Sequence, residues 1–139
     1  MKQRLKTEKR LIFSILLVLI SNCIWSQTST KDYPSKFSFS KTTLDMGYRG
    51  KKEENWKGTI SYNNGRVYIK DESGEKINSF ILLSKGVYKD LGDNMYGYLF
   101  TSKAELVTGT VIITEICKAK TTIGFQFILS NGWTQTYYK

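Results

Sequence analysis

Acidic side chains gather at three places where their spacing could support acid–base chemistry. A hydrolase that acts on sugars needs two carboxylates converging at about 5–9 Å across a cleft. A calcium site needs six or more oxygen ligands. The acidic groups are Glu53-Glu54; Asp71, Glu72 and Glu75; and Asp90 and Asp93. Each lies in a turn-rich segment with too few ligands for calcium and no cleft to face, so we expect solvent-exposed acids.

The sequence contains no histidine. This excludes Ser-His-Asp and Cys-His triads, a histidine general base and histidine-ligated zinc or haem. No phosphate-binding loop, dinucleotide fingerprint, metal-ligand spacing or nucleophile elbow occurs either. We therefore expect a protein that is not an enzyme, with no catalytic residues, no metal and no cofactor.

The thiol of Cys117 is a further candidate for chemistry. The only other cysteine is Cys23, in the N-terminal tract, so no disulfide is expected within the folded part. Residues 112–117, which are rich in β-branched side chains, predict a strand that contains Cys117. A reactive thiol needs a flanking base or cation, and only Lys118 and Lys120 are near in sequence. We interpret Cys117 as a buried structural thiol.

Aromatic residues are the most informative feature of the chain. Residues 27–139 contain nine Tyr, six Phe and two Trp. Tyr and Trp combine an apolar body with a polar tip, which suits a ligand cavity or a flat binding face. The alternative is a small β-core filled with rings. The candidate ligand or partner surface is Tyr96, Tyr98, Trp133 and Tyr137.

The formal net charge of +9 divides into two parts. Residues 1–26 carry five Lys/Arg and one Glu, a net charge of +4, and residues 27–139 carry +5. The basic cluster at residues 49–52 is nearly cancelled by Glu53 and Glu54. No basic stripe with interleaved aromatics occurs, so we expect no nucleic-acid partner. The remaining excess favours solubility, or contact with anionic envelope polymers, lipid headgroups or an acidic protein.

The N-terminus has the order of a secretory signal peptide. Residues 1–10 are basic, residues 11–20 are apolar apart from Ser14, and small polar residues follow. The apolar run is shorter than the ~20 residues that span ~30 Å of hydrocarbon. We expect a signal helix within residues 1–26, cleavage after Ser26, and an exported protein that is periplasmic or extracellular.

Lipidation at Cys23 is the alternative to cleavage. Residues 19–23 resemble a bacterial lipobox, although Asn22 takes the place of the small residue before the cysteine. Acyl chains on Cys23 would make the protein a membrane-anchored lipoprotein. Otherwise only the signal segment would contact a membrane.

The chain after residue 36 alternates apolar and polar residues throughout. β-branched and aromatic residues dominate the alternating runs, as half-buried strands favour. Asn-Gly at residues 64–65 and 131–132 supplies hairpin turns. We expect one all-β domain at residues 37–139, preceded by a polar linker at residues 27–36 that contains the only proline, Pro34.

Short connections between successive strands predict antiparallel neighbours. The expected topology is an up-and-down meander of about eight strands. Closure removes the exposed sheet edges, so we expect a small closed or nearly closed barrel. An open twisted sheet or a β-sandwich is the alternative.

This pattern behind a signal peptide resembles the lipocalin-like and other calycin-type barrels. The Gly-x-Trp motif that opens lipocalins is absent, since residues 56–58 hold Trp and Gly in reverse order. The resemblance implies a monomeric, non-catalytic envelope protein that binds a small apolar or amphipathic ligand. The alternative function is a secreted or periplasmic protein-interaction module, such as an inhibitor or an immunity-type protein.

Overall fold

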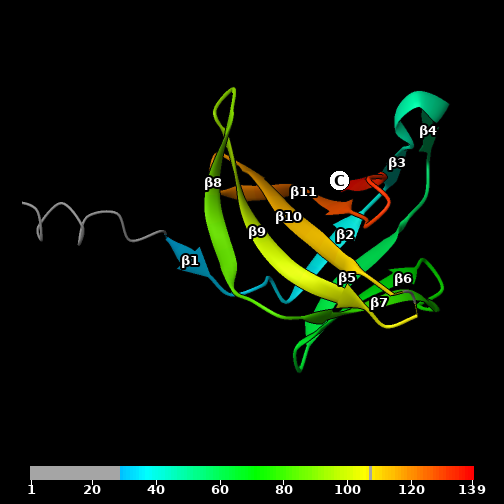
Figure 1. The fold of residues 1–139 in the computed structure, drawn as a ribbon, viewed down its shortest axis with the longest axis horizontal. Coiled ribbons are helices and arrows are strands. Elements are labelled where there is room, and N and C mark those ends of the chain that lie inside the picture. Colours follow the sequence, from blue (N-terminus) through cyan, green and yellow to red (C-terminus); the bar gives the residue numbers. More distant parts are fainter. Residues whose placement is uncertain (1–28, 107) are drawn as a thin grey trace, which may run out of the picture.

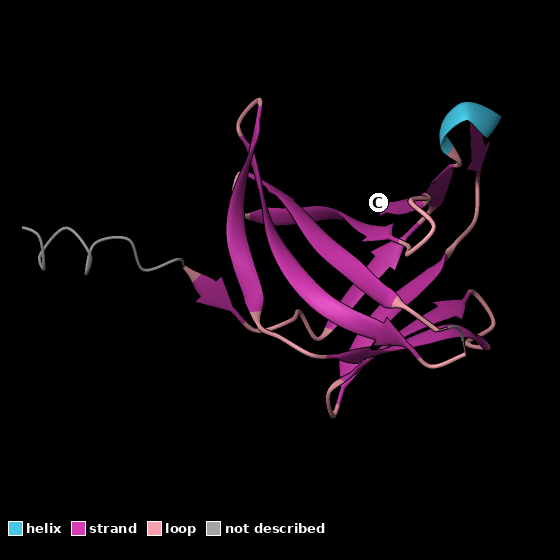
Figure 2. Cartoon of the chain, viewed as in Figure 1, coloured by secondary structure: helices cyan, strands magenta, loops and turns pink. Residues whose placement is uncertain are grey.

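The computed structural model describes residues 29–106 and 108–139, most of which form β-strands (Figure 2). The strands are β1 (Thr30–Lys31), β2 (Lys36–Phe39), β3 (Lys41–Asp45), β4 (Lys51–Glu54), β5 (Gly58–Asn63), β6 (Arg66–Asp71), β7 (Lys76–Leu82), β8 (Gly86–Gly92), β9 (Met95–Ala104), β10 (Thr110–Lys118), β11 (Thr121–Ile128) and β12 (Thr134–Tyr138). A 3₁₀ helix, η1 (Gly47–Arg49), follows β3. Within these parts of the chain, no helix is long and apolar enough to cross a membrane. The signal peptide predicted at residues 1–26, with the cleavage at Ser26 and the alternative lipidation at Cys23, lies outside the described residues.

The predicted antiparallel all-β fold is confirmed. The twelve strands form one strongly curved sheet in the order β2-β5-β6-β7-β9-β10-β11-β12-β3-β4, with β8 on β9 and β1 on β8 (Figure 1). The expected closed or nearly closed barrel was wrong: the sheet is not closed, because the strand that would close it is broken at Ser40. On one side of this residue β2 pairs with β5, and on the other β3 pairs with β12 and β4. The Ser40 N–H donates to the Tyr138 carbonyl at 2.8 Å, which ties the break to the last strand.

The structure has twelve strands rather than about eight, because β1, β3, β4 and β8 lie in segments where no strand is expected from the alternation. The pairs β2–β3, β4–β5 and β7–β8 are each separated by one to three residues. The partner strand β9 runs straight past one such interruption, pairing with β7 near its C-terminal end and with β8 near its N-terminal end. Strand alternation alone does not reveal where a long strand turns.

The concave side of the sheet is filled by side chains. Phe100, Phe125 and Phe127 are fully buried there, in register with Ile113 and other buried positions of β10. The ring of Tyr33 packs among them, with its centroid 4.9 Å from that of Phe100 and 5.3 Å from that of Phe125. The interior is therefore a packed aromatic core.

The segment predicted as a polar linker contributes to this core. Residues 30–31 form β1 and pair with β8, and Tyr33 is only 6% exposed. Lys36 begins β2. Residues 30–36 therefore belong to the folded domain, which their polar composition did not predict.

Candidate functional site

Among the described residues, Glu115 is the only acidic side chain that is buried, and it is fully so. It lies on β10 between the buried Ile113 and Cys117. The Lys31 ammonium lies 3.0 Å from Glu115 Oε1 and 2.8 Å from Oε2. The Thr122 hydroxyl donates to Oε1 at 2.6 Å. This group, which we call the Glu115 cluster, joins β1 to β10 and β11.

The electrostatics of the Glu115 cluster favour a structural role. Burial disfavours the charged ammonium of Lys31, but the hydrogen bond and negative charge of Glu115 outweigh burial and raise its pKa. Burial, with a further contribution from Glu115, raises the pKa of Cys117 to about 11. Burial likewise raises the pKa of Tyr33, again with a contribution from Glu115. The thiol therefore stays protonated at neutral pH, and the carboxylate is neutralised by Lys31, so the cluster offers no activated nucleophile.

Two of the four residues predicted as a binding surface lie next to this cluster. Tyr96 and Tyr98 stand on β9 opposite Cys117 and Glu115. They form a three-ring group with Tyr88 of β8, with centroids 5.8–6.0 Å apart. The Lys31 ammonium lies 4.6 Å from the centroid of the Tyr98 ring. Tyr96 and Tyr98 are half-buried, and Tyr88 is 43% exposed.

The other two predicted surface residues lie elsewhere. Tyr137 of β12 is 6% exposed, and its ring centroid is 4.8 Å from that of Phe39 and 5.4 Å from that of Phe127. It is a core residue. Trp133 precedes β12, and the centroid of its ring lies 5.9 Å from the guanidinium carbon of Arg49. The four residues do not form one surface, because the inward face of β12 packs into the core.

The acidic groups lie on separate elements. Glu53 and Glu54 are exposed on β4, where we had expected a loop, because this segment pairs with β3. The Asp71 carboxylate accepts hydrogen bonds from the Ser73 hydroxyl at 2.6 Å and the Glu75 N–H at 2.9 Å, within the β6–β7 turn. In residues 29–106 and 108–139, no group of three or more His, Cys, Asp or Glu side chains is placed to hold a metal ion.

The convex face of β8, β9, β10 and β11 carries an apolar depression. Two hollows of about 380 and 330 Å³ both include Lys89 and Leu99 in their lining. Leu99 is in register with Val87 on one side and Thr114 on the other, so these residues share a face. The aliphatic side chains that line one or the other hollow are Val87, Leu91, Leu99, Ile112, Ile116, Ile123 and Ile128. We call this surface the outer groove.

Comparison of the chain with protein-family models, curated proteins and solved structures gave no match. The geometry of the chain itself must therefore carry any functional proposal.

Sequence reasoning missed both the Glu115 cluster and the outer groove. A signal for Glu115 was present, since it interrupts an alternating series of buried Val111, Ile113 and Cys117. Lys31 had no such signal, because it lies in a polar segment. The outer groove was missed because alternation identifies the apolar face of each strand, whereas β9 to β11 carry apolar residues on both faces.

Proposed function

We propose that this protein is a non-catalytic binding domain that holds an amphipathic ligand in the outer groove. The observation that carries the proposal is the pairing of two adjoining aliphatic hollows with a shared, exposed lysine, Lys89. An acyl or alkyl chain would lie along Leu99 and Ile116, and a negatively charged head would lie near the ammonium of Lys89. Burial of the ligand's acyl or alkyl chain supplies the binding free energy, and the charge of Lys89 sets which way round the ligand lies in the groove.

Because the interior is packed with side chains, we place the ligand on the convex face of the sheet. A lipocalin-like barrel would hold its ligand inside, but Tyr33, Phe100 and Phe125 occupy the centre of this sheet. Opening the interior would leave these rings without partners, at a cost comparable with a large-to-small core substitution. The outer groove needs no such rearrangement.

The proposed setting is the cell envelope or the extracellular space. It rests on the basic, apolar and polar order of residues 1–26. We propose that the domain acts there as a monomer, released after Ser26 or tethered through Cys23.

The experiment is isothermal titration calorimetry with two probes of equal chain length, the anionic laurate and the neutral dodecyl maltoside, each below its micelle concentration. We expect both to bind and laurate to bind more tightly. Leu99→Gln should weaken both by about tenfold, since it removes roughly 1–2 kcal/mol of apolar contact. Lys89→Gln should weaken laurate alone by about threefold, as expected for one exposed charge pair.

Ile81→Gln is the matched control, because Ile81 is a half-buried residue on β7, outside the groove. It should leave both affinities unchanged. Failure of both probes to bind, or equal losses in Leu99→Gln and Ile81→Gln, would reject the proposal.

A second candidate is a protein-interaction module, favoured by the Tyr88–Tyr96–Tyr98 group. Tyrosine is one of the residues enriched at interface hot spots, and these three rings are partly exposed. Native mass spectrometry of the protein purified from its own host separates the candidates. A co-purifying lipid or metabolite supports the first, and a stoichiometric protein lost in Tyr88→Ala supports the second.

A further inference from the structure

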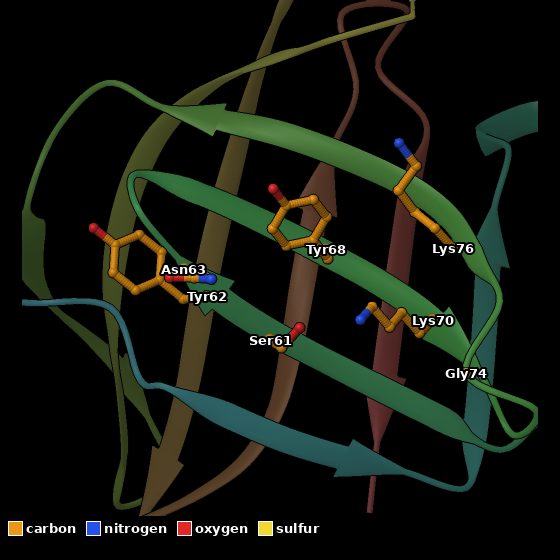
Figure 3. Close-up of a pocket in the computed structure, with 7 residues that line it drawn as sticks. All are labelled: Ser61, Tyr62, Asn63, Tyr68, Lys70, Gly74 and Lys76. Carbon is orange, nitrogen blue, oxygen red and sulfur yellow. The ribbon is translucent and has the colours of Figure 1, made fainter.

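A third hollow, of about 650 Å³, lies on the sheet away from the outer groove (Figure 3). It is lined by Ser61, Tyr62, Asn63, Tyr68, Lys70, Gly74 and Lys76, from β5, β6, β7 and the β6–β7 turn. It shares no lining residue with the outer groove. Every lining side chain except that of Gly74 ends in a hydroxyl, amide or ammonium group, while the tyrosine rings and lysine methylenes supply apolar surface, so the hollow suits an amphipathic ligand such as a sugar.

Two lysines on neighbouring strands line this hollow, with the Lys70 amine directed toward Ser61 and the Lys76 amine directed away from β6 (Figure 3). Lys70 of β6 and Lys76 of β7 are direct cross-strand partners. Among the described residues, no carboxylate lies within ion-pairing distance of either ammonium, whereas five other basic residues have such partners. Like charges directly opposite on neighbouring strands destabilise a sheet. An anion bound between Lys70 and Lys76 would remove this repulsion.

The surrounding face contains further cations, and the Glu105 carboxylate that reaches it is held by Arg66 and by the hydroxyl of Ser79, the cross-strand partner of Tyr68. The residues that alternate with the buried Phe37, Ile60 and Val67 point to this side of β2, β5 and β6. They are Lys36, Ser38, Thr59, Ser61, Asn63, Arg66, Tyr68 and Lys70. The nearest acids are either already bound or at the edge. Glu105 pairs with Arg66 at 3.1 Å, and the β6–β7 turn acids lie at one end.

Uncharged groups complete a surface suited to a sugar ring. Figure 3 shows Ser61, Tyr68 and Lys70 on the same side of β5 and β6, with the Lys70 amine directed toward Ser61 and Tyr68. The Lys70 ammonium lies 6.0 Å from the Tyr68 ring centroid. A tyrosine ring packs against the apolar face of a sugar, and its neighbours can bond the sugar hydroxyls.

We propose that this hollow binds an acidic polysaccharide. The carboxylates of successive uronate residues would lie against Lys70 and Lys76, and one sugar ring would pack on Tyr68. The hollow is a shallow depression on an open sheet face, so a polymer can pass through it without an end being enclosed. This site is independent of the ligand proposed for the outer groove.

The test is affinity electrophoresis and calorimetry of the full protein, purified from its host, with polygalacturonate as the probe. Lys70→Gln/Lys76→Gln should weaken binding at least tenfold. The control is Lys118→Gln/Lys120→Gln, the same charge change at the β10–β11 turn, which should weaken binding less than twofold. Tyr68→Leu should weaken polygalacturonate binding about fivefold while leaving the thermal midpoint within two degrees.

Two further probes decide whether sugar or charge is recognised. Neutral dextran should not bind, and polyglutamate and a single-stranded oligonucleotide should bind at least tenfold more weakly than polygalacturonate. Equal losses in the two double-lysine variants would overturn the proposal. So would equal affinity for polyglutamate or the oligonucleotide, since either shows attraction of any polyanion.

Discussion

A carboxylate stands at Glu115, where strand alternation places an apolar side chain. A buried charge is tolerated when it is paired and hydrogen-bonded; here Lys31 pairs with the carboxylate, and Lys31 and Thr122 both donate to Oε1, while Oε2 has the ion pair alone. The pair also attaches β1, a strand of two residues that pairs with β8, to β10. The ion pair of Lys31 and the packing of the Tyr33 ring together hold residues 30–33 against the sheet.

Replacing Lys31 should measurably destabilise the fold. Lys31→Met leaves the Glu115 carboxylate buried without its cation. Losses of ~3–5 kcal/mol are typical when one partner of a fully buried pair is removed. The Lys31 side chain is 35% exposed, so solvent reduces the effect. We expect a loss of about 2 kcal/mol in the free energy of urea unfolding.

The matched control is Lys85→Met, which breaks an exposed pair with Asp32. Exposed pairs contribute little, so we expect a change below about 0.5 kcal/mol. The double variant Lys31→Met/Glu115→Leu should recover most of the lost stability. A loss in Lys85→Met as large as in Lys31→Met would show that the buried pair has no special role.

Stability should fall with rising pH as the unfolded thiol ionises. The pKa of Cys117 is raised from 9.0 to about 11 by burial and then by the charge of Glu115. Between these values the unfolded chain loses a proton that the folded chain keeps, so stability decreases with pH. A difference of two pKa units between the folded and unfolded thiol corresponds to at most about 2–3 kcal/mol in the free energy of unfolding. Cys117→Ala should reduce the fall in thermal midpoint between pH 9 and 11, and the remaining fall reflects Tyr33 and Tyr137, whose pKa values burial also raises.

Val111→Ala is the comparison for this measurement, because Val111 is a buried, non-titrating neighbour on the same face of β10. It should lower the midpoint at every pH and keep the wild-type slope. A slope unchanged in Cys117→Ala would refute the assignment to this thiol.

At the scale of elements, the bends decide the shape of the sheet. Gly58 begins β5 just after the interruption that separates it from β4. A Cβ added there would lie 2.2 Å from the Lys70 carbonyl oxygen and 2.6 Å from Phe39 Cζ. Glycine therefore lets β2, β5 and β6 approach closely at this point. The sequence showed a glycine within an alternating run, but not what it approaches.

Gly58→Ala should destabilise the protein by about 2 kcal/mol, because backbone atoms must move to admit the methyl group. Ser61→Ala, at an outward-facing position of the same strand, should change stability by less than about 0.5 kcal/mol. Chemical unfolding of both variants tests this. Equal effects would mean that the close contact at Gly58 is relieved without cost.

At the scale of the whole molecule, the convex surface divides by chemistry. The outer groove over β8 to β11 is aliphatic, whereas the face over β2, β5, β6 and β7 is basic and rich in hydroxyls. The two proposed ligands therefore bind different strands. Either site can be disabled without altering the packed core that both share.

The predicted export concerns the whole molecule, because cleavage or lipidation decides where the mature chain begins. Intact mass measurement of the protein from its host should show a chain that begins at Gln27. A diacyl- or triacyl-modified chain beginning at Cys23 would support the lipoprotein alternative. An unmodified chain that retains residues 1–26 would disprove cleavage.

The all-β class, the antiparallel neighbours and the hairpin turns followed from the sequence, because period-two alternation and Asn-Gly turns are local signals. The buried thiol of Cys117 was predicted in the same way. The break at Ser40, the entry of Tyr33 into the core and the pairing of Lys31 with Glu115 were decided only by tertiary structure. Each depends on which distant strands become neighbours, and a strand's alternation says which side it buries but not against what. For the same reason, the sequence did not show that Tyr137 and Trp133 lie apart from Tyr96 and Tyr98. Both proposed sites are also lined by side chains from several strands, so no single segment could reveal them.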